Sequence, residues 1–305
     1  MVSFRPTTET DRIQLAALLA TVWKGEEGGA AYHGGGRRAG WLAYAGEDVV
    51  GYGQLWHSVL HPTYAYVGVH VHPDWRGQGI GGHLWKTVTS GADKPLKAKT
   101  YATQRPAVRF LERHGLTCTV QTHEPTLALA HLSDPAAITE AKQLGFRLLP
   151  MTALPSELGR QLLPLHREVY RHTHLHDPAQ VDVMDEEDFL GDDLCPDWLF
   201  VAEKGNELAG VASVRRSDAP DMGELAWFGV TERFAATGQP LTLALVTAAL
   251  QAARVGGVRM VNAELDSADP NALHLWHTLP WIPGKTWLTL AEQAKPEKTA
   301  SSLRH

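Results

Sequence analysis

The sequence predicts an α/β (α+β) protein built from two copies of one structural unit. The chain has 305 residues, more than a single hydrophobic core usually serves, so two domains are expected. Helical and strand-like hydrophobic patterns alternate along both halves. Gly51 and Val71 recur as Gly210 and Val230 at one constant offset, which spans a hairpin and the strand after it. Such a match indicates a duplication of domain size.

The first half begins with a helical pattern over residues 8–23, in which Ile13, Leu18 and Val22 share one face. The glycine-rich segment 30–38 is expected to be a mobile loop. Alternation and turn residues predict the strands, and glycine or proline at the ends of 3.6-residue patterns predicts the helices. The expected strands are 41–45, 49–58, 64–71, 96–102, 117–123 and 126–132, and the expected helices are 79–89 and 106–114.

The second half repeats this order after a capped helix at 134–146. Its expected strands are 198–203, 208–215, 223–230 and 259–265, and its expected helices are 158–170, 241–254 and 271–278. The polar end of the chain shows no core pattern and is expected to fray. The predicted domains are therefore 1–133 and 134–290, followed by a tail at 291–305.

Composition narrows the class of protein. Apolar residues make up 44% of the chain and charged residues 20%, and the net charge of −6 argues against a general nucleic-acid binder. The two cysteines, Cys118 and Cys195, have no metal-binding spacing. The start of the chain lacks the pattern of a signal peptide, and no stretch has the length and apolarity of a membrane helix. We expect a cytoplasmic protein, monomeric or homodimeric, with no metal and no membrane contact.

A glycine-rich loop, residues 76–82, lies between the strand that ends at Val71 and the following helix. Helix N-termini bind anions, and glycines let the backbone approach phosphates closely. The dinucleotide fingerprint would require an acidic residue about twenty positions later, but residues 97–102 contain none. A nucleotide P-loop would require Gly-Lys-Ser/Thr, which is absent. Because the loop lacks both features, coenzyme A is favoured over a nucleotide as its ligand. The remaining alternative is a glycine-rich turn that binds no ligand.

The pattern Val71-x-Pro73-x-x-Arg76-x-x-Gly79-x-Gly81 resembles the acyl-CoA signature of the GNAT superfamily of acetyl-CoA-dependent N-acyltransferases. A weaker version of the same unit follows in the second half, so the chain resembles tandem GNAT proteins, the arrangement of mycothiol synthase-like proteins. The resemblance implies two tandem GNAT-like acyl-CoA N-acyltransferase units. Each would be a mixed, mostly antiparallel sheet flanked by helices, with CoA entering where two strands splay.

The resemblance also implies roles for individual residues. The backbone of Val69, His70 and Val71 would bind the pantetheine arm of acetyl-CoA as an added strand does. Gln104 stands where the family often has an asparagine that binds this arm. Leu111 stands where the family often has a tyrosine that protonates the leaving thiolate, and leucine has no proton to donate. The pyrophosphate would be held by the loop residues Arg76, Gly77, Gln78, Gly79, Ile80, Gly81 and Gly82.

An amine acceptor is mostly protonated at neutral pH and needs a general base, often acting through water. The long strand of the first unit offers Tyr64, Tyr66, His70 and His72 and no acid. His70 is the first choice because histidine titrates near neutrality, although a histidine on the outer face of the strand is an equally good interpretation. Glu224, on the equivalent strand of the second unit, is the second candidate.

The second copy departs from the signature. Residues 235–240, which read Ala-Ala-Thr-Gly-Gln-Pro, stand opposite residues 76–81, so the arginine is missing and Pro240 has no N–H to donate. Trp276 stands at the position of the family tyrosine. We therefore expect the first unit to bind CoA and the second to have a degenerate CoA loop.

Two further clusters favour plain structural interpretations. Three histidines alternate over residues 172–176 and would share one face of a strand, but a solvated loop is favoured over a metal site. The acidic run at 182–193 is expected to be a solvated helix face rather than an attractant for a cationic amine.

The combined prediction is an N-acetyltransferase. It would transfer acetyl from acetyl-CoA to a primary amine of a small molecule or peptide, by direct attack in a ternary complex. The amine site is expected near residues 34–36 and the hairpin. The alternatives are a catalytically decayed tandem GNAT acting as a CoA-binding sensor or interaction scaffold, and an enzyme that transfers a longer acyl group.

Overall fold

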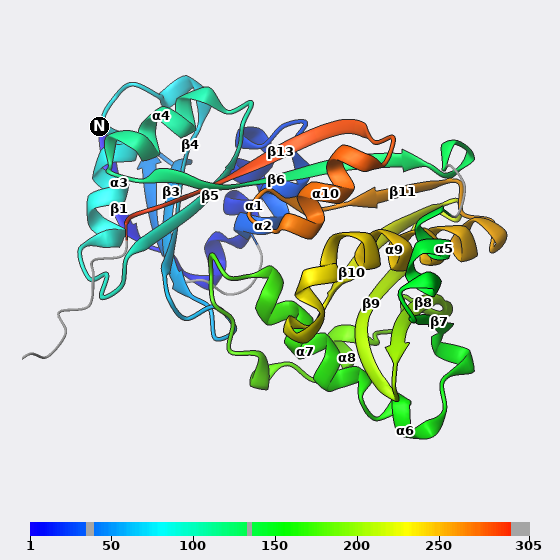
Figure 1. Cartoon of the computed structure of the whole chain (residues 1–305). Coiled ribbons are helices and arrows are strands. Elements are labelled where there is room, and N and C mark those ends of the chain that lie inside the picture. Colours follow the sequence, from blue (N-terminus) through cyan, green and yellow to red (C-terminus); the bar gives the residue numbers. More distant parts are fainter. Residues whose placement is uncertain (35–39, 133–135, 294–305) are drawn as a thin grey trace, which may run out of the picture. The chain divides into compact units, whose positions relative to one another are not determined.

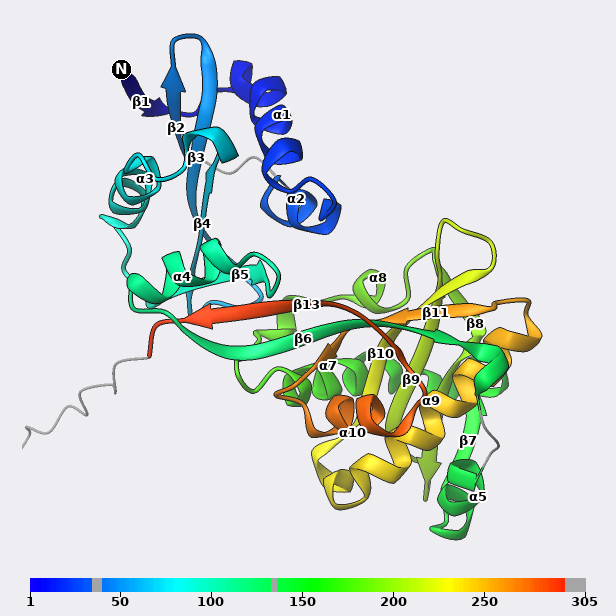
Figure 2. The ribbon, with the colours of Figure 1, turned by 90° about the horizontal axis from the view of Figure 1, so that it is seen from above.

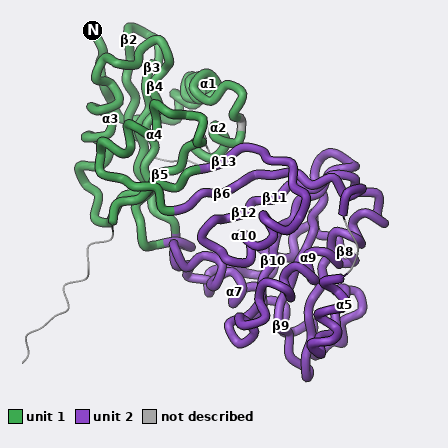
Figure 3. Tube along the Cα trace, turned by 45° about the horizontal axis from the view of Figure 1, so that its top comes forward, with its two compact units in different colours: residues 1–58, 62–119, 288–305 green, residues 59–61, 120–287 purple. Residues whose placement is uncertain are grey.

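The structure, a computed structural model, describes residues 1–34, 40–132 and 136–293. The chain forms two compact units (Figure 3). Unit 1 contains residues 1–58, 62–119 and 288–305, and unit 2 contains residues 59–61 and 120–287. Two strands run through both units, so the boundary differs from a single cut after residue 133. No helix among the described residues has the length and apolarity to cross a bilayer.

Unit 1 is a sheet with helices on both faces (Figure 2). Its strand order is β1-β2-β3-β4-β5-β13. Helices α1 and α2 cover one face of β2 to β4, and α3 covers the other. The elements are β1 (Val2–Pro6), α1 (Arg12–Val22), α2 (Glu27–Gly34), β2 (Gly40–Ala45), β3 (Asp48–His57), β4 (Ala65–Val71), α3 (Ile80–Thr89), β5 (Leu96–Tyr101), α4 (Arg105–Arg113), the start of β6 (Thr117–Ala128) and the end of β13 (Ile282–Ala291).

Unit 2 repeats this plan in the strand order β13-β6-β11-β10-β9-β8-β7, with β12 paired to β6. Its long helix α9 packs on β8, β9 and β10 and is buried along most of its length (Figure 1). The elements are α5 (Ala136–Gln143), β7 (Arg147–Pro150), α6 (Ser156–Gly159), α7 (Leu162–Thr173), α8 (Glu186–Phe189), β8 (Leu194–Lys204), β9 (Glu207–Arg216), β10 (Met222–Val230), α9 (Gly238–Val255), β11 (Met260–Ala263), β12 (Leu265–Asp266) and α10 (Pro270–Thr278).

The internal repeat holds at the level of strand register. Gly51 of β3 pairs with Val71 of β4, and Gly210 of β9 pairs with Val230 of β10. Most of the described strand pairs in both units are antiparallel, and each unit contains a parallel pair, β4–β5 or β10–β11. The predicted α/β class with two copies of one mixed, mostly antiparallel unit is therefore confirmed.

Strands β4 and β5 separate soon after they begin. Their parallel pairing joins Ala65 to Leu96 and Tyr66 to Lys97. The remaining residues of β4, from Val67 to Val71, have no partner on that side among the described pairs. In unit 2 the corresponding pairing covers four positions of β10, from Met222 to Leu225. Residues 226–230 of β10 therefore also lack a partner on that side among the described pairs, so the gap covers five residues of the strand in each unit.

The glycine-rich segment is not a loop over its described part. Residues 27–34 form helix α2, and residues 35–39 lie outside the described residues. A Cβ on Gly29 would stand 2.2 Å from Cε3 of Trp23, and a Cβ on Gly28 would stand 2.9 Å from the Tyr101 hydroxyl. The loop prediction, made for residues 30–38, was wrong for residues 30–34, which continue a helix that begins at Glu27. In the first turn of this helix Gly28 and Gly29 allow close packing on Tyr101 and Trp23.

Three other local predictions also need correction. Instead of two strands at 117–123 and 126–132, residues 117–128 form one continuous strand, β6, and residues 129–131 form a 3-10 turn. Strand β6 passes Pro125 because it pairs with β12 up to His123 and with β11 from Thr126 onward. Ile13 is 84% exposed and does not share the buried face of α1. Strand β13 extends to Ala291, where a frayed tail was predicted, and residues 294–305 lie outside the described residues.

One buried carboxylate ties the start of unit 1 together. Asp11 accepts hydrogen bonds from the Arg5 guanidinium, the Tyr44 hydroxyl, and the backbone N–H and hydroxyl of Thr8, at 2.6–2.9 Å. The Arg5 hydrogen bonds, with those from Thr8 and Tyr44, hold the pKa of Asp11 far below its ordinary value, against the opposing effect of burial. Asp11 thereby fastens β1 and β2 to the segment that leads into α1.

We expect Asp11→Asn to destabilise the protein by on the order of 2 kcal/mol at pH 7, because it removes a charge from buried hydrogen bonds. Since the folded-state pKa is lowered, this contribution is complete above the unfolded-state pKa of about 3.9 and is lost as the pH falls below it. Urea unfolding of the unmodified protein and of Asp11→Asn should therefore show a difference in the free energy of unfolding at pH 7, and this difference should shrink below about pH 4. A difference in the free energy of unfolding that does not change with pH would contradict the stabilising role of the Asp11 carboxylate.

Candidate active site

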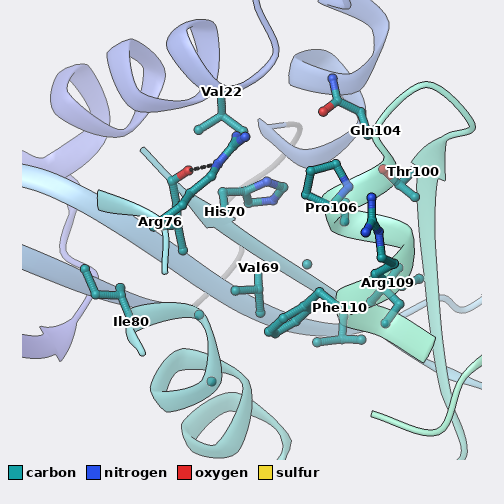
Figure 4. Close-up of a pocket in the computed structure, with 18 of the residues that line it drawn as sticks. Val22, Val69, His70, Arg76, Ile80, Thr100, Gln104, Pro106, Arg109 and Phe110 are labelled. Atoms are coloured by element: carbon teal, nitrogen blue, oxygen red, sulfur yellow. Dashed lines mark hydrogen bonds between the residues drawn. The ribbon is translucent and has the colours of Figure 1, made fainter. Parts of the chain in front are cut away.

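A pocket of about 610 Å³ opens in unit 1 at the gap between β4 and β5. It is lined on one side by the start of α3 and by α4, and on the other by the end of α1 and by His33 of α2 (Figure 4). Both strands contribute neighbouring residues, whose side chains alternate between the two faces of the sheet. The pocket therefore reaches both faces of the sheet through the gap.

The loop before α3 has the geometry of an anion cradle. Gly77 and Gly79 have φ angles of 79° and 82°, in the left-handed region that favours glycine. A Cβ on either glycine would meet no other atom within 4 Å, so the space above the loop is open. Gly79 is the N-cap of α3, whose first turn carries no acidic residue. The free N–H groups of this helix end therefore face the pocket.

Arg76 closes this end of the pocket. Its Nε donates a hydrogen bond to the carbonyl of Val71 at 3.1 Å (Figure 4). The bond fixes the guanidinium beside the last residue of β4 while leaving the side chain exposed. Five of the six predicted loop residues after Arg76 also line the pocket, the exception being Gln78.

The backbone of β4 presents free polar groups to the gap. The N–H of His72 donates to Val50 of β3, whereas the N–H of Ala65 donates to Pro95, which precedes β5. Because N–H and C=O directions alternate along an antiparallel strand, the backbone groups of Val69 and Val71 face the gap and those of His70 face β3. The backbone of Val69 and the N–H of Val71 thus have the orientation needed to pair with an extended ligand, whereas the Val71 carbonyl already accepts the hydrogen bond from Arg76.

The side chain of His70 lies on the opposite face of β4 from Val69, toward α1 and α2 (Figure 4). It is 4% exposed, and its ring centroid lies 4.5 Å from that of His33 and 5.9 Å from that of Trp23. Burial, with a smaller effect of His33, holds the pKa of His70 well below 6.5. His70 is therefore a neutral imidazole at the pocket wall, and its Nε2 has no hydrogen-bond partner among the described residues.

Three side-chain nitrogens from three elements converge above Gly68. A Cβ on residue 68 would stand 2.9 Å from Nδ1 of His33, 3.1 Å from Nε2 of Gln54 and 3.1 Å from Nε2 of His70. Gln54 is itself fixed by donating to the carbonyl of His33 at 2.9 Å and accepting from the Tyr52 hydroxyl at 3.0 Å. Glycine at position 68 is what allows the two histidines to approach the strand and each other.

Helix α4 supplies the remaining wall. Gln104 is its N-cap, and Leu111 is buried on its inner side; both line the pocket. No tyrosine stands at the position of Leu111, so α4 offers no phenolic proton there. Sequence reasoning did not identify Trp23, His33, Lys99 or Arg109 as lining residues. These residues belong to four different elements, and no local pattern links them.

The equivalent region of unit 2 has no glycine cradle, and a smaller pocket of about 280 Å³ lies there between Gln239 and α10. A 3-10 helix (Glu232–Thr237) leads directly into α9, and Gly238 has an ordinary helical φ of −57°. Asn271 of α10 packs over this end, its Oδ1 3.1 Å from the place of a Cβ on Gly238, and Gln239 donates to the carbonyl of Pro270 at 3.5 Å. A turn with two left-handed glycines is therefore replaced by a continuous helical segment covered by α10.

Comparison with known proteins identifies the family. A sequence model of the Acetyltransferase (GNAT) family matches residues 14–116 and 160–279, which lie in the first and second copy. The chain belongs to the GNAT acetyltransferase family. Its tandem organisation, predicted from the repeat, is confirmed by the two separate matches.

Solved structures agree on the fold. The chain is similar to a GCN5-related N-acetyltransferase from Sphaerobacter thermophilus, with 16% identity, 95% of each chain covered and a TM-score of 0.66. It is also similar to a tandem GNAT protein from the clavulanic acid biosynthesis pathway, with 19% identity, 97% and 99% covered and a TM-score of 0.60. A search of curated protein sequences gives no match.

The other predicted residues are not among those that line this pocket. Glu224 is exposed on β10 of unit 2, opposite Arg215 of β9, and Tyr64 and Tyr66 are not lining residues. His174 is not in a solvated loop: it stacks on Tyr170 with centroids 3.9 Å apart, and burial lowers its pKa to about 4. The described residues contain no cluster of three or more histidine, cysteine or acidic side chains able to hold a metal.

Proposed function

We propose that this GNAT protein transfers an acetyl group from acetyl-CoA to an amine, and that the reaction takes place in unit 1. The observation that supports this most is the continuity of one pocket. The pocket extends from the open helix N-terminus at Gly79, through the gap beside Val69 and Val71, to His70 on the other face of the sheet. A phosphate cradle, an unpaired strand edge and a titratable group are thereby connected in one cavity.

The pocket fits the parts of acetyl-CoA. The loop from Gly77 to Gly82 offers backbone N–H groups to a pyrophosphate, and Arg76 adds a positive charge. The edge of β4 offers the N–H and C=O of Val69 and the N–H of Val71 to the amides of a pantetheine arm, as in strand addition. Gln104, at the N-cap of α4, is the side-chain amide on the opposite wall.

The reaction needs one bond exchange. The amine nitrogen forms a bond to the acetyl carbon, the C–S bond breaks, and the thiolate leaves with that electron pair while the amine gives up a proton. A backbone N–H at the gap stabilises the charge that develops on the carbonyl oxygen. Leu111 cannot protonate the thiolate, but a thiol with a pKa of about 8.5 leaves as an anion near neutral pH without an acid. His70 is the proposed proton acceptor, directly or through water.

Unit 2 is proposed to have lost this ability. Its helical entry into α9 has no left-handed glycine, Ala235 stands at the position of Arg76, and Pro240 lacks an N–H. Arg233, in the same segment, forms an ion pair with Glu207. Loss of even one charge-assisted hydrogen bond costs about 1.5–3 kcal/mol, or roughly ten- to hundredfold in affinity.

Isothermal titration of the full chain with acetyl-CoA is therefore expected to give one site per chain. Product formation from acetyl-CoA and a panel of amines, followed by thiol release, tests the catalytic part of the proposal. Two sites of equal affinity would show that unit 2 retains its cradle, and binding without turnover of any amine would favour a CoA-binding sensor instead.

A further inference from the structure

The permanent charges that line the pocket of unit 1 are all positive. They belong to Arg76, Lys99, Arg109 and Arg113, and no aspartate or glutamate is among the described lining residues. Glu26, which precedes α2, does not line the pocket, and its carboxylate accepts a hydrogen bond from the Thr103 hydroxyl at 3.3 Å. A concave site lined by one sign of charge attracts ligands of the opposite sign.

Lys99 lies apart from the three arginines. The arginines belong to the loop before α3 and to α4, the side of the proposed phosphate cradle. Lys99 lies on β5, and its ammonium is 5.8 Å from the ring centroid of Tyr32 in α2. Its carbonyl is hydrogen-bonded to Nε2 of His33 at 3.3 Å. Lys99 is therefore the cation at the end of the pocket where the acceptor has to bind.

Flat rings form the walls of this end. Trp23 and His33 are stacked at 15° with centroids 5.2 Å apart, and His70 lies against both. All three side chains are buried and line the pocket. Tyr32 and Trp56 continue the aromatic surface beyond His33, at 4.8 Å and 6.3 Å. Such surroundings favour a planar ring, which can stack on its neighbours.

A protonated alkylamine does not suit these surroundings. Its pKa of about 10 keeps it cationic at neutral pH, and it would enter a cavity lined by cations. No carboxylate among the described lining residues can pair with the ammonium, and a buried neutral histidine is a weak acceptor for the proton of so basic an amine. An aromatic amine is uncharged at neutral pH and avoids both difficulties.

We infer that the acceptor of unit 1 is a planar aromatic amine that carries a carboxylate. Lys99 binds the carboxylate, and the ring lies against Trp23 and His33. The inference rests on the proposed acetyl transfer and specifies its substrate. The aryl nitrogen forms the bond to the acetyl carbon as the C–S bond breaks, and its proton passes to His70 or solvent. The products are an N-acetylated aryl carboxylate and the CoA thiol.

Three related acceptors test the two parts of this inference separately. 4-Aminobenzoate has the aromatic amine and the charge, 4-aminobenzamide keeps the amine without the charge, and 4-(aminomethyl)benzoate keeps the charge but has an alkylamine. We expect kcat/KM for thiol release at pH 7.5 to be about 10- to 100-fold higher for the benzoate than for the benzamide, as one charge-assisted contact provides. It should also exceed that of the alkylamine.

The variant Lys99→Gln assigns the charge preference to one residue. It should lower the benzoate-to-benzamide ratio by about 10- to 100-fold. Lys86→Gln, on the exposed face of α3 outside the pocket, is the matched control and should leave the ratio unchanged. Titration of each variant with acetyl-CoA shows whether the donor site is intact.

Each other outcome overturns the inference. If Lys99→Gln leaves the benzoate-to-benzamide ratio of kcat/KM unchanged, Lys99 does not bind the carboxylate. Faster turnover of 4-(aminomethyl)benzoate than of the aromatic amines rejects the aromatic class while leaving acetyl transfer to amines standing. If no amine is turned over although acetyl-CoA binds, both the inference and the proposed reaction fail.

Discussion

Replacing Gly79 with valine is expected to lower the affinity for acetyl-CoA by at least about 100-fold. Gly79 has a φ of 82° and is the N-cap of α3. A β-branched residue is strained in this region by about 1–2 kcal/mol or more. We expect the loop to relax to another conformation, in which the N–H groups at the start of α3 no longer point into the pocket. Two lost charge-assisted hydrogen bonds of about 1.5–3 kcal/mol each account for an effect of this size.

Gly46→Val is the matched control for this experiment. Gly46 lies in the turn between β2 and β3 with a φ of 64°, and a Cβ there would also meet nothing within 4 Å. Both variants carry the same kind of backbone strain, so similar decreases in the midpoint of thermal unfolding are expected. Isothermal titration should separate them, because only Gly79 belongs to the pocket. Equal affinities for acetyl-CoA would mean that the loop does not hold the phosphates.

The features that could be predicted from the sequence depend on a short segment or on a regular spacing of residues. The turn between β4 and α3 is a local signal, because glycines at 77 and 79 adopt left-handed angles that other residues avoid. The duplication could be detected because the register of a hairpin fixes the spacing between Gly51 and Val71. The same hydrogen bond recurs in both copies, from His72 to Val50 and from Thr231 to Ala209.

The features that were missed depend on contacts between distant segments. Strands β6 and β13 run through both units, and their own sequences do not indicate which strands they pair with. Helix α2 carries glycines that would ordinarily indicate a loop, and their function becomes clear only where Gly29 meets Trp23. His174 was assigned to solvent because the burial that Tyr170 provides is invisible in a local window.

The sequence analysis selected His70 and a region near residues 34–36 but not the contacts that assemble the proposed acceptor end. His33, His70 and Lys99 come from α2, β4 and β5 and meet only in the folded unit. His70 was selected from the sequence for its ordinary titration range, yet burial moves its pKa out of that range. The residue type was therefore predictable from the strand pattern, whereas its protonation state was not.

Replacing His70 with glutamine is expected to lower kcat by about 100- to 10,000-fold, the usual range for loss of a general base. The backbone of residue 70 faces β3, so affinity for acetyl-CoA should change little. His72→Gln is the control, because His72 is two residues farther along the chain, past the end of β4, and does not line the pocket. Loss of turnover in His70→Gln with unchanged affinity for acetyl-CoA would show that His70 acts in catalysis rather than in packing.

The pH profile provides an independent check on this role. Since burial lowers the pKa of His70, the imidazole stays neutral throughout the neutral range, and the base is lost only as the pH falls well below 6.5. With an aromatic amine, which is itself uncharged, kcat should therefore be flat between about pH 6.5 and 8 and decline only in more acidic solution. A decline centred on pH 6.5 would require a solvent-exposed histidine. A decline that persists in His70→Gln would assign the proton transfer to a different group.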